Sequence, residues 1–271
     1  MPTQLEKTAH FCALHAGPAF VIANAWDAGS AKILAGMGFP ALATSSGASA
    51  GLRGRRDGQV TRDEALADAS MIVDATDLPV SADLEKGFAD APAEAAETYR
   101  LAAATGLAGA SIEDASGDRT KPIYDFSHAV DRVAAAVQAA RATNTGFVLT
   151  ARAEGHLRGQ TDLDETIRRL QAYEAAGADV LMAPGVTDLD QIRTVCAALN
   201  KPFNFMAGIP NRSHTVPALA AAGVRRISLA TSLYRAAMSG LILAAREVQQ
   251  TGNLTYIDTS LPGSEVTAYF S

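Results

Sequence analysis

The sequence lacks the features that direct a protein to a membrane or to a nucleic acid. No apolar run approaches the roughly 18 residues that a membrane span needs. Basic residues form no blocks, and the formal net charge is -6, so a phosphate backbone is not an expected partner. We therefore predict a soluble protein that binds small molecules, and neither nucleic acid nor a membrane.

Cysteine is scarce, with only Cys12 and Cys196 in 271 residues. The two show neither a CxxC motif nor a spacing typical of metal ligands. The start of the sequence, MPTQLEKTAH, has no basic segment followed by an apolar stretch, which a secretory signal would show. We expect a cytoplasmic protein in which neither thiol takes part in chemistry.

Short runs rich in Val, Ile, Leu and Phe alternate about eight times with Ala-rich segments of helical periodicity. The predicted strands are Ala19–Ala23, Ala41–Thr44, Val80–Ala82, Gly109–Ile112, Phe147–Thr150, Asp179–Met182, Phe203–Met206 and Arg226–Leu229. The predicted helices are Ala28–Met37, Thr61–Ala75, Ala91–Thr105, Ser127–Ala142, Leu163–Ala176, Asp188–Leu199, Thr215–Ala222 and Thr231–Gln250. Glycines precede several strands, as in MGFPAL and AGADVL, a pattern typical of helix ends that lead into parallel strands.

Eight strand–helix units predict an α/β fold, a (β/α)8 TIM barrel, formed by one domain over residues 1–271. The alternative is an open doubly wound sheet. No GxGxxG motif follows the first strand, which makes that alternative less favoured. The tail after residue 251 has little periodicity, and we expect it to pack on a neighbour or to fray.

In a TIM barrel the residues that follow the strands form the active site, and here these residues are acidic. Asp83 and Glu85 follow the third strand on the same side of the chain, and Glu113 follows the fourth. Asp57 lies in a glycine-rich, cationic loop after the second strand. Carboxylates gathered at one mouth repel each other unless a cation lies between them, and oxygen ligands alone favour Mg²⁺ or Mn²⁺. The alternative reading is that these acids cap helices.

Arg152 follows the fifth strand, where its guanidinium can bind a carboxylate or phosphate through two nitrogens. A structural ion pair with Glu113 or Glu154 is the alternative for this arginine. His156, four residues further on, is a candidate proton carrier or simply a solvated loop residue.

Two hydroxyls and a glycine follow the second strand at Ser45, Ser46 and Gly47. This small segment lets backbone N–H groups approach an anion, so it is a candidate site for a substrate carboxylate. A plain helix N-cap is the alternative reading.

These residues resemble the isocitrate lyase/phosphoenolpyruvate mutase superfamily from Asn24 to the eighth predicted helix. The most specific pieces are SSG at Ser45–Gly47, DLEKGF at Asp83–Phe88, GASIED at Gly109–Asp114 and ARAE at Ala151–Glu154. Their order and their placement after successive strands carry the resemblance.

The resemblance implies roles for individual residues. Asp83 matches the direct metal ligand, and Asp57, Glu85 and Glu113 match acids that hold the metal mostly through water. Ser46 and Gly47 match the backbone site for the substrate carboxylate, and Arg152 matches its arginine clamp. Members of the family are often tetramers that exchange the last helix, so we expect a homo-oligomer, a dimer or tetramer, with Thr231–Gln250 swapped between subunits.

The chain also departs from the family's lyases. Their cysteine-containing loop after the fourth strand is replaced by Asp114–Pro122, which has no cysteine. Ala183-Pro184-Gly185 and Ala207-Gly208 stand where such lyases place a substrate-binding glutamate and an asparagine. These departures put a cysteine-dependent lyase activity in doubt. For the missing proton acceptor, His156, Tyr124 and a metal-bound water are the candidates.

The first-ranked function is cleavage of a C–C bond in a small 2-oxo or 2-hydroxy di- or tricarboxylate. The enzyme would be a Mg²⁺-dependent lyase or decarboxylase that passes through a metal-stabilised enolate. The second is a phosphoenolpyruvate/phosphonopyruvate mutase or a hydrolase of phosphonate bonds. The third is a barrel that binds a dicarboxylate without catalysis.

Overall fold

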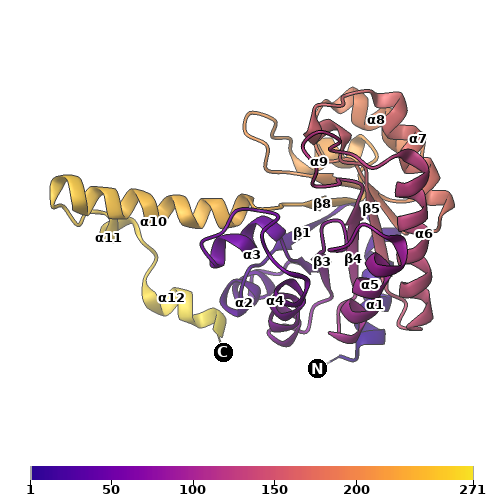
Figure 1. Ribbon diagram of the computed structural model, residues 1–271. Coiled ribbons are helices and arrows are strands. Elements are labelled where there is room, and N and C mark those ends of the chain that lie inside the picture. Colours follow the sequence, from indigo (N-terminus) through magenta and orange to yellow (C-terminus); the bar gives the residue numbers. More distant parts are fainter. Residues whose placement is uncertain (1, 271) are drawn as a thin grey trace.

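The eight strands close into one parallel barrel in which each strand pairs with its neighbours in the sequence and β8 pairs with β1. The structure is a computed structural model and describes residues 2–270 (Figure 1). The strands are β1 Phe20–Asn24, β2 Leu42–Ala43, β3 Val80–Asp83, β4 Gly109–Glu113, β5 Val148–Arg152, β6 Val180–Met182, β7 Phe203–Met206 and β8 Arg226–Ser228. The predicted TIM barrel is therefore confirmed, and all eight predicted strands are present within one or two residues of their expected bounds.

Helices surround the barrel and connect its strands (Figure 1). They are α1 Gln4–Ala16, α2 Ala28–Gly36, α3 Ser46–Leu52, α4 Arg62–Asp74, α5 Pro92–Ala104, α6 Phe126–Ala142, α7 Leu163–Ala175, α8 Leu189–Ala197, α9 Val216–Ala221 and α10 Ser232–Thr251, with a 3-10 turn η1 at Gly155–Arg158. Gly177 and Gly223 precede β6 and β8 with φ of 100° and 99°. The glycine signals at these helix ends therefore mark true left-handed turns.

The core has two parts, because alternate residues of a strand face opposite sides of the sheet. The larger part packs outward-facing residues such as Ile112 and Leu149 against the helices. The smaller part, which includes Phe20, Ile22 and Val148, lies inside the barrel and packs against Phe11 of α1. Helix α1 was not predicted, and Phe11 explains its place: this fully buried ring covers the end of the barrel interior opposite the active-site mouth.

The C-terminal segment differs most from the expectation. Helix α10 extends away from the barrel, and the chain then returns through α11 Tyr256–Thr259 and α12 Gly263–Thr267 to a 3-10 turn η2 at Ala268–Phe270 (Figure 1). This turn packs on α2 of the same chain, where the Lys32 Nζ donates a hydrogen bond to the Phe270 carbonyl at 3.1 Å. The segment after residue 251 does not fray, because short helices and the contact with α2 order it, while its packing on a neighbour stays a prediction. None of the helices between residues 2 and 270 is long and apolar enough to cross a membrane.

Candidate active site

Arg152, the last residue of β5, gathers three carboxyl groups at the C-terminal mouth of the barrel. Its Nη1 lies 2.8 Å from Asp83 Oδ1, and its Nη2 lies 2.9 Å from Glu113 Oε2 and 2.8 Å from Glu154 Oε1. The register of the sheet explains the contact with Glu113, because β4 and β5 place Glu113 and Arg152 directly opposite each other. Both structural ion pairs that the sequence left open are present, together with the pair to Asp83.

Asp83 ends β3 and is held from several sides. Its Oδ2 accepts a hydrogen bond from the Ser46 N–H at 3.2 Å, and its Oδ1 accepts one from the Glu85 N–H at 3.3 Å. Its own backbone N–H donates to Thr44 Oγ1 at 2.9 Å. The alternative that Asp83 or Glu85 caps the next helix is not realised, because Ala91 is the N-cap of α5.

The local charges set opposite protonation tendencies within this cluster. Burial opposes ionisation of Asp83, but the Arg152 charge and the Ser46 N–H outweigh it and hold the pKa of this carboxyl below its ordinary value. Burial raises the pKa of Glu113 well above its ordinary value, with repulsion from Glu154 and Asp83 and in spite of Arg152. Asp83 is thus a carboxylate, while Glu113 can hold a proton.

Glu85 lies beside the cluster in a strained backbone conformation, with φ of 48°. Burial, followed by repulsion from Asp83 and Asp57, raises the pKa of Glu85 to about 7. Asp57 is exposed on the loop after α3, and its side chain reaches Gly47. The loop and β3 therefore bring Asp57, Asp83 and Glu85 into the same region, with more negative charge than Arg152 alone balances.

This excess negative charge is the feature that fits a divalent cation, because a cation would relieve the repulsion that raises the Glu85 pKa. Within residues 2–270, however, no three His, Cys, Asp or Glu side chains form a ready cluster of metal ligands. Asp83 and Glu113 both point to Arg152 instead. Such a cluster is not needed if Asp83 is the one direct ligand and water lies between the ion and the other acids. Mg²⁺ usually keeps several waters.

Ser45, Ser46 and Gly47 lie where β2 meets α3. Ser45 is the N-cap of α3 but makes no side-chain capping hydrogen bond, and Ser46 and Gly47 begin the helix. A Cβ added at Gly47 would lie 2.7 Å from Thr231 Cγ2 and 3.4 Å from Asp57 Oδ2. Only glycine fits this close packing against Thr231 and Asp57. The backbone site for a substrate carboxylate stays a prediction.

His156 lies apart from the acidic cluster. It belongs to η1, its Nδ1 is 3.2 Å from Thr166 Oγ1, and its Nε2 is a buried atom without a hydrogen-bond partner among residues 2–270. Burial lowers the pKa of His156. No described ion pair or hydrogen bond joins it to Arg152 or to the acids, so its expected role as proton carrier rests on sequence position alone. Tyr124 also lies elsewhere, with its hydroxyl bonded to the Asp90 carboxylate.

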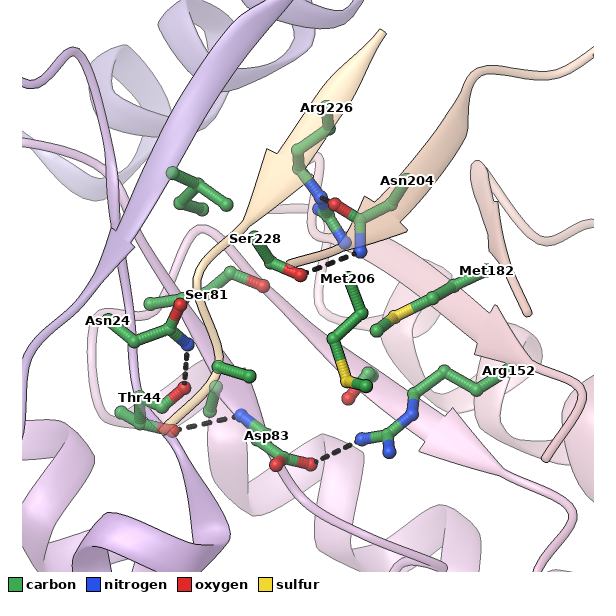
Figure 2. A pocket seen from close by; sticks show the side chains of 15 residues that line it. Asn24, Thr44, Ser81, Asp83, Arg152, Met182, Asn204, Met206, Arg226 and Ser228 are labelled. Carbon is green, nitrogen blue, oxygen red and sulfur yellow. Dashed lines mark hydrogen bonds and ion pairs between the residues drawn. The ribbon is translucent and has the colours of Figure 1, made fainter. Parts of the chain in front are cut away.

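A cavity of about 70 Å³ opens beneath Asp83 and Arg152 into the barrel (Figure 2). Met182 and Met206 point into it from β6 and β7, and Asn24 borders it from β1. Sequence reasoning missed these residues because Met and Asn at strand ends carry no specific signal. It also gave Glu154 only as a possible ion-pair partner, although this residue is 1% exposed and binds Arg152 through two nitrogens.

A second layer supports Glu154. Its backbone N–H donates to Asp114 Oδ1 at 2.8 Å, and Asp114 Oδ2 accepts from the Tyr173 hydroxyl at 2.7 Å and from Arg169 at 3.2 Å. Asp114 therefore does not cap a helix. It fixes the segment after β5 and so orients the carboxyl group that holds Arg152.

Residues 11–249 match a family model described as Phosphoenolpyruvate phosphomutase. The chain belongs to the phosphoenolpyruvate mutase/isocitrate lyase superfamily. It is 47% identical to a protein from Burkholderia cenocepacia J2315 provisionally described as a lyase/mutase, over 99% of this chain and 96% of that one, with a TM-score of 0.96. The match to a protein from the same organism provisionally described as a phosphonomutase is 36% identical, over 90% and 99% of the two chains, with a TM-score of 0.83.

A 2-methylisocitrate lyase from Escherichia coli (strain K12) is also similar, with 34% identity over 174 residues, 61% of this chain and 57% of that protein. These relatives are described as lyases or mutases, two of them provisionally, and the family resemblance seen in the sequence is confirmed. The chain is therefore an enzyme of the isocitrate lyase/phosphoenolpyruvate mutase type.

Proposed function

We propose that this enzyme cleaves a C–C bond in a small 2-oxo or 2-hydroxy di- or tricarboxylate, as a Mg²⁺-dependent lyase or decarboxylase. The observation that carries the proposal is the meeting of Asp83, Glu113 and Arg152 at the mouth of the barrel. One guanidinium beside several acids can bind a substrate carboxylate and stabilise negative charge that develops when a bond breaks. The similarity to a 2-methylisocitrate lyase supports this reaction class.

Each residue has a proposed task. Arg152 binds the substrate carboxylate, and some of its ion pairs with the acids give way to ion pairs with the substrate. The N–H groups at Ser46 and Gly47, near the start of α3, would bind another oxygen of the same group, because helix N-termini favour anions. The Ser46 N–H donates to Asp83 in this structure and would turn from it to the substrate. Glu113, with its raised pKa, holds a proton at the mouth.

The acids have the oxygen donors that Mg²⁺ or Mn²⁺ requires. We propose Asp83 as the direct ligand, with Glu85, Glu113 and Asp57 acting through water. A bound ion would supply positive charge that stabilises a developing enolate. The ion pair between Arg152 and Asp83 would then loosen, because Asp83 would share its charge with the ion.

Transfer or hydrolysis at a C–P bond, as in a phosphoenolpyruvate/phosphonopyruvate mutase or phosphonate hydrolase, is the second candidate. The match to a protein provisionally described as a phosphonomutase favours it. The same anion site would then hold a phosphonate. The third candidate, a barrel that binds a dicarboxylate without turnover, differs from both in that its binding would survive removal of the metal.

One experiment separates the first two candidates. Purified protein with Mg²⁺ is incubated with a panel of 2-oxo and 2-hydroxy di- and tricarboxylates, and release of CO2 or of a 2-oxo acid is measured. Phosphonopyruvate is followed in parallel by phosphorus NMR. The proposal expects C–C cleavage of at least one acid, and turnover of phosphonopyruvate alone would overturn it.

The control for this experiment is Asp83→Ala, beside Asp190→Ala as a matched variant. Asp190 is an exposed carboxylate in the first turn of α8 that pairs with Arg193 and has no described contact with Arg152 or its acids. Turnover should disappear in the first variant and persist in the second. Turnover that survives both Asp83→Ala and EDTA would contradict the metal-dependent chemistry.

We further propose that residues 1–271 form one domain, and that the protein is a cytoplasmic homo-oligomer, a dimer or tetramer, in which α10 packs on a neighbouring subunit. No residue of α10 is buried within the chain, and Leu241, Ile242 and Leu243 are 62%, 47% and 64% exposed. A helix with this apolar surface is stable in water when a second subunit covers it. Light scattering after size-exclusion chromatography tests the assembly, and a monomer would contradict it.

A further inference from the structure

The interior of this barrel contains a guanidinium that the proposed reaction does not use. Arg226 begins β8, pairs with Phe20 of β1 and Asn204 of β7, and is 4% exposed. Figure 2 shows its side chain at one end of the cavity, away from the Asp83 and Arg152 pair. Large aliphatic side chains usually fill this position of a TIM barrel. A buried cation here calls for an explanation.

All hydrogen-bond partners of Arg226 are neutral. Its Nε donates to Asn204 Oδ1 at 3.0 Å and its Nη2 donates to Thr150 Oγ1 at 2.9 Å. The third partner is His15 of α1, whose Nε2 lies 3.4 Å from Nη1. Because His15 Nδ1 lies 2.8 Å from the Phe11 carbonyl, Nδ1 carries the proton and Nε2 accepts.

The surroundings keep His15 uncharged. Burial and the nearby Arg226 charge lower the pKa of His15 to about 3. Burial also lowers the pKa of Arg226, to about 9, which leaves the guanidinium protonated at neutral pH. Across residues 2–270, no carboxylate forms an ion pair with Arg226. A buried charge without a counter-charge is unfavourable by several kcal/mol.

The space above Arg226 can hold the missing counter-charge. The cavity of about 70 Å³ is lined by Ser81 and Ser111 as well as by Arg226. The structure shows no hydrogen bond to the hydroxyl of Ser81 or of Ser111 among residues 2–270, and both residues face the cavity. The hydroxyl of Thr150 accepts a hydrogen bond from Arg226. Since a water occupies roughly 30 Å³, the cavity has room for about two groups of that size.

We infer that the barrel interior binds one small monovalent anion, of the size of chloride, between the Arg226 guanidinium and the serine hydroxyls of β3 and β4. Hydroxyl protons and guanidinium N–H groups are the donors that such an anion accepts. The acids at the mouth do not contact Arg226: Asp83, Glu113 and Glu154 pair with Arg152, and no carboxylate among residues 2–270 forms an ion pair with Arg226. This site lies at the Arg226 end of the cavity that opens beneath Asp83 and Arg152, and it goes beyond the proposed reaction.

The test measures thermal unfolding of the full-length protein in sodium chloride, sodium bromide and sodium gluconate at equal ionic strength. Gluconate, whose six-carbon chain is much larger than chloride, serves as the reference anion. The melting temperature should rise by about 3 °C for each tenfold increase in chloride above its dissociation constant, because the anion binds only the folded state. In bromide-soaked crystals, an anomalous peak should lie beside the guanidinium.

Variants link the effect to Arg226. The chloride dependence should vanish in Arg226→Met and persist in Arg225→Met, which removes the same charge from the exposed neighbouring position. If Arg226→Met does not fold, Arg226→Lys keeps a charge with fewer donors and should shift the dependence to higher chloride. Equal melting temperatures in chloride and gluconate, with no bromide peak inside the barrel, would overturn the inference and show that the mouth acids balance Arg226 from a distance.

Discussion

Removal of the Arg152 guanidinium should lower the stability of the fold and its activity together. Its partners Asp83, Glu113 and Glu154 have side chains that are 20%, 10% and 1% exposed. Loss of one partner of a buried ion pair costs about 3–5 kcal/mol, because the other charge stays buried and unpaired. In Arg152→Met three carboxyl groups lose the same partner. Protonation of the most buried ones limits the total to about 5 kcal/mol at neutral pH.

The effect of pH on this variant has a definite sign. Burial already raises the pKa values of Glu113 and Glu154, and loss of Arg152 raises them further. When the pKa of a carboxyl group is higher in the folded than in the unfolded state, the group destabilises the fold as pH rises above its pKa in the unfolded chain. The reason is that the unfolded chain loses this proton first. The stability difference between wild type and Arg152→Met should therefore be larger at about pH 8 than at about pH 5.

Urea unfolding followed by circular dichroism at both pH values measures the difference, and kcat/KM should fall by roughly 10²–10³-fold. Arg158→Met is the matched control: its side chain is 45% exposed and lies 3.9 Å from Glu154 Oε2. Because exposed pairs contribute at most about 1 kcal/mol, this variant should stay near wild type. Two results would contradict this prediction: an equal loss of unfolding free energy in both variants, or a loss in Arg152→Met that does not change with pH.

Two further variants probe other parts of the structure. Below about pH 6.5 the wild-type free energy of unfolding should fall as pH falls, because the unfolded chain binds a proton at His15 and the folded chain does not. In His15→Gln this fall should be shallower by up to about 1.4 kcal/mol per pH unit. Urea midpoints that change with pH in parallel in both proteins would argue against a buried neutral His15. Ser46 is the first residue of α3, a position where proline is tolerated, and Ser46→Pro removes the N–H that donates to Asp83. This variant should reduce kcat/KM about tenfold more than Ser46→Ala, which keeps the N–H. Equal kcat/KM values in the two variants would show that this N–H has no part in the reaction.

The fold could be predicted because its signals are local and repeated. Each apolar run, each helical period and each glycine before a strand, such as Gly177, pointed to the same βα unit. Helix α1 and the segment after residue 251 carry no comparable repeated signal, and their structure depends on contacts with the rest of the chain. Phe11 is ordered by the barrel interior, and Phe270 by its contact with Lys32.

The candidate site could be predicted in part. Asp83, Glu113 and Arg152 meet because parallel strands end at one mouth, a consequence of the topology. Asp83, Glu113 and Glu154 share one guanidinium because of the side-chain rotamers that all four residues adopt together. These rotamers cannot be predicted from the sequence of a single strand end. The polar interior around Arg226 was not predicted either. In a short strand such as Arg-Ile-Ser, the alternation of polar and apolar residues does not tell which side of the strand faces a close-packed core and which side faces a cavity.

The central claim is that the acids and Arg152 form a joint site for a divalent metal and a carboxylate. Calorimetric titration of oxalate, a small dicarboxylate with two oxygens placed for chelation, tests it directly in wild type and Asp83→Ala. Wild type should bind oxalate with Mg²⁺ but not after EDTA, and Asp83→Ala should not bind it in either condition. Oxalate binding of equal strength with and without Mg²⁺, or undiminished binding by Asp83→Ala, would contradict it.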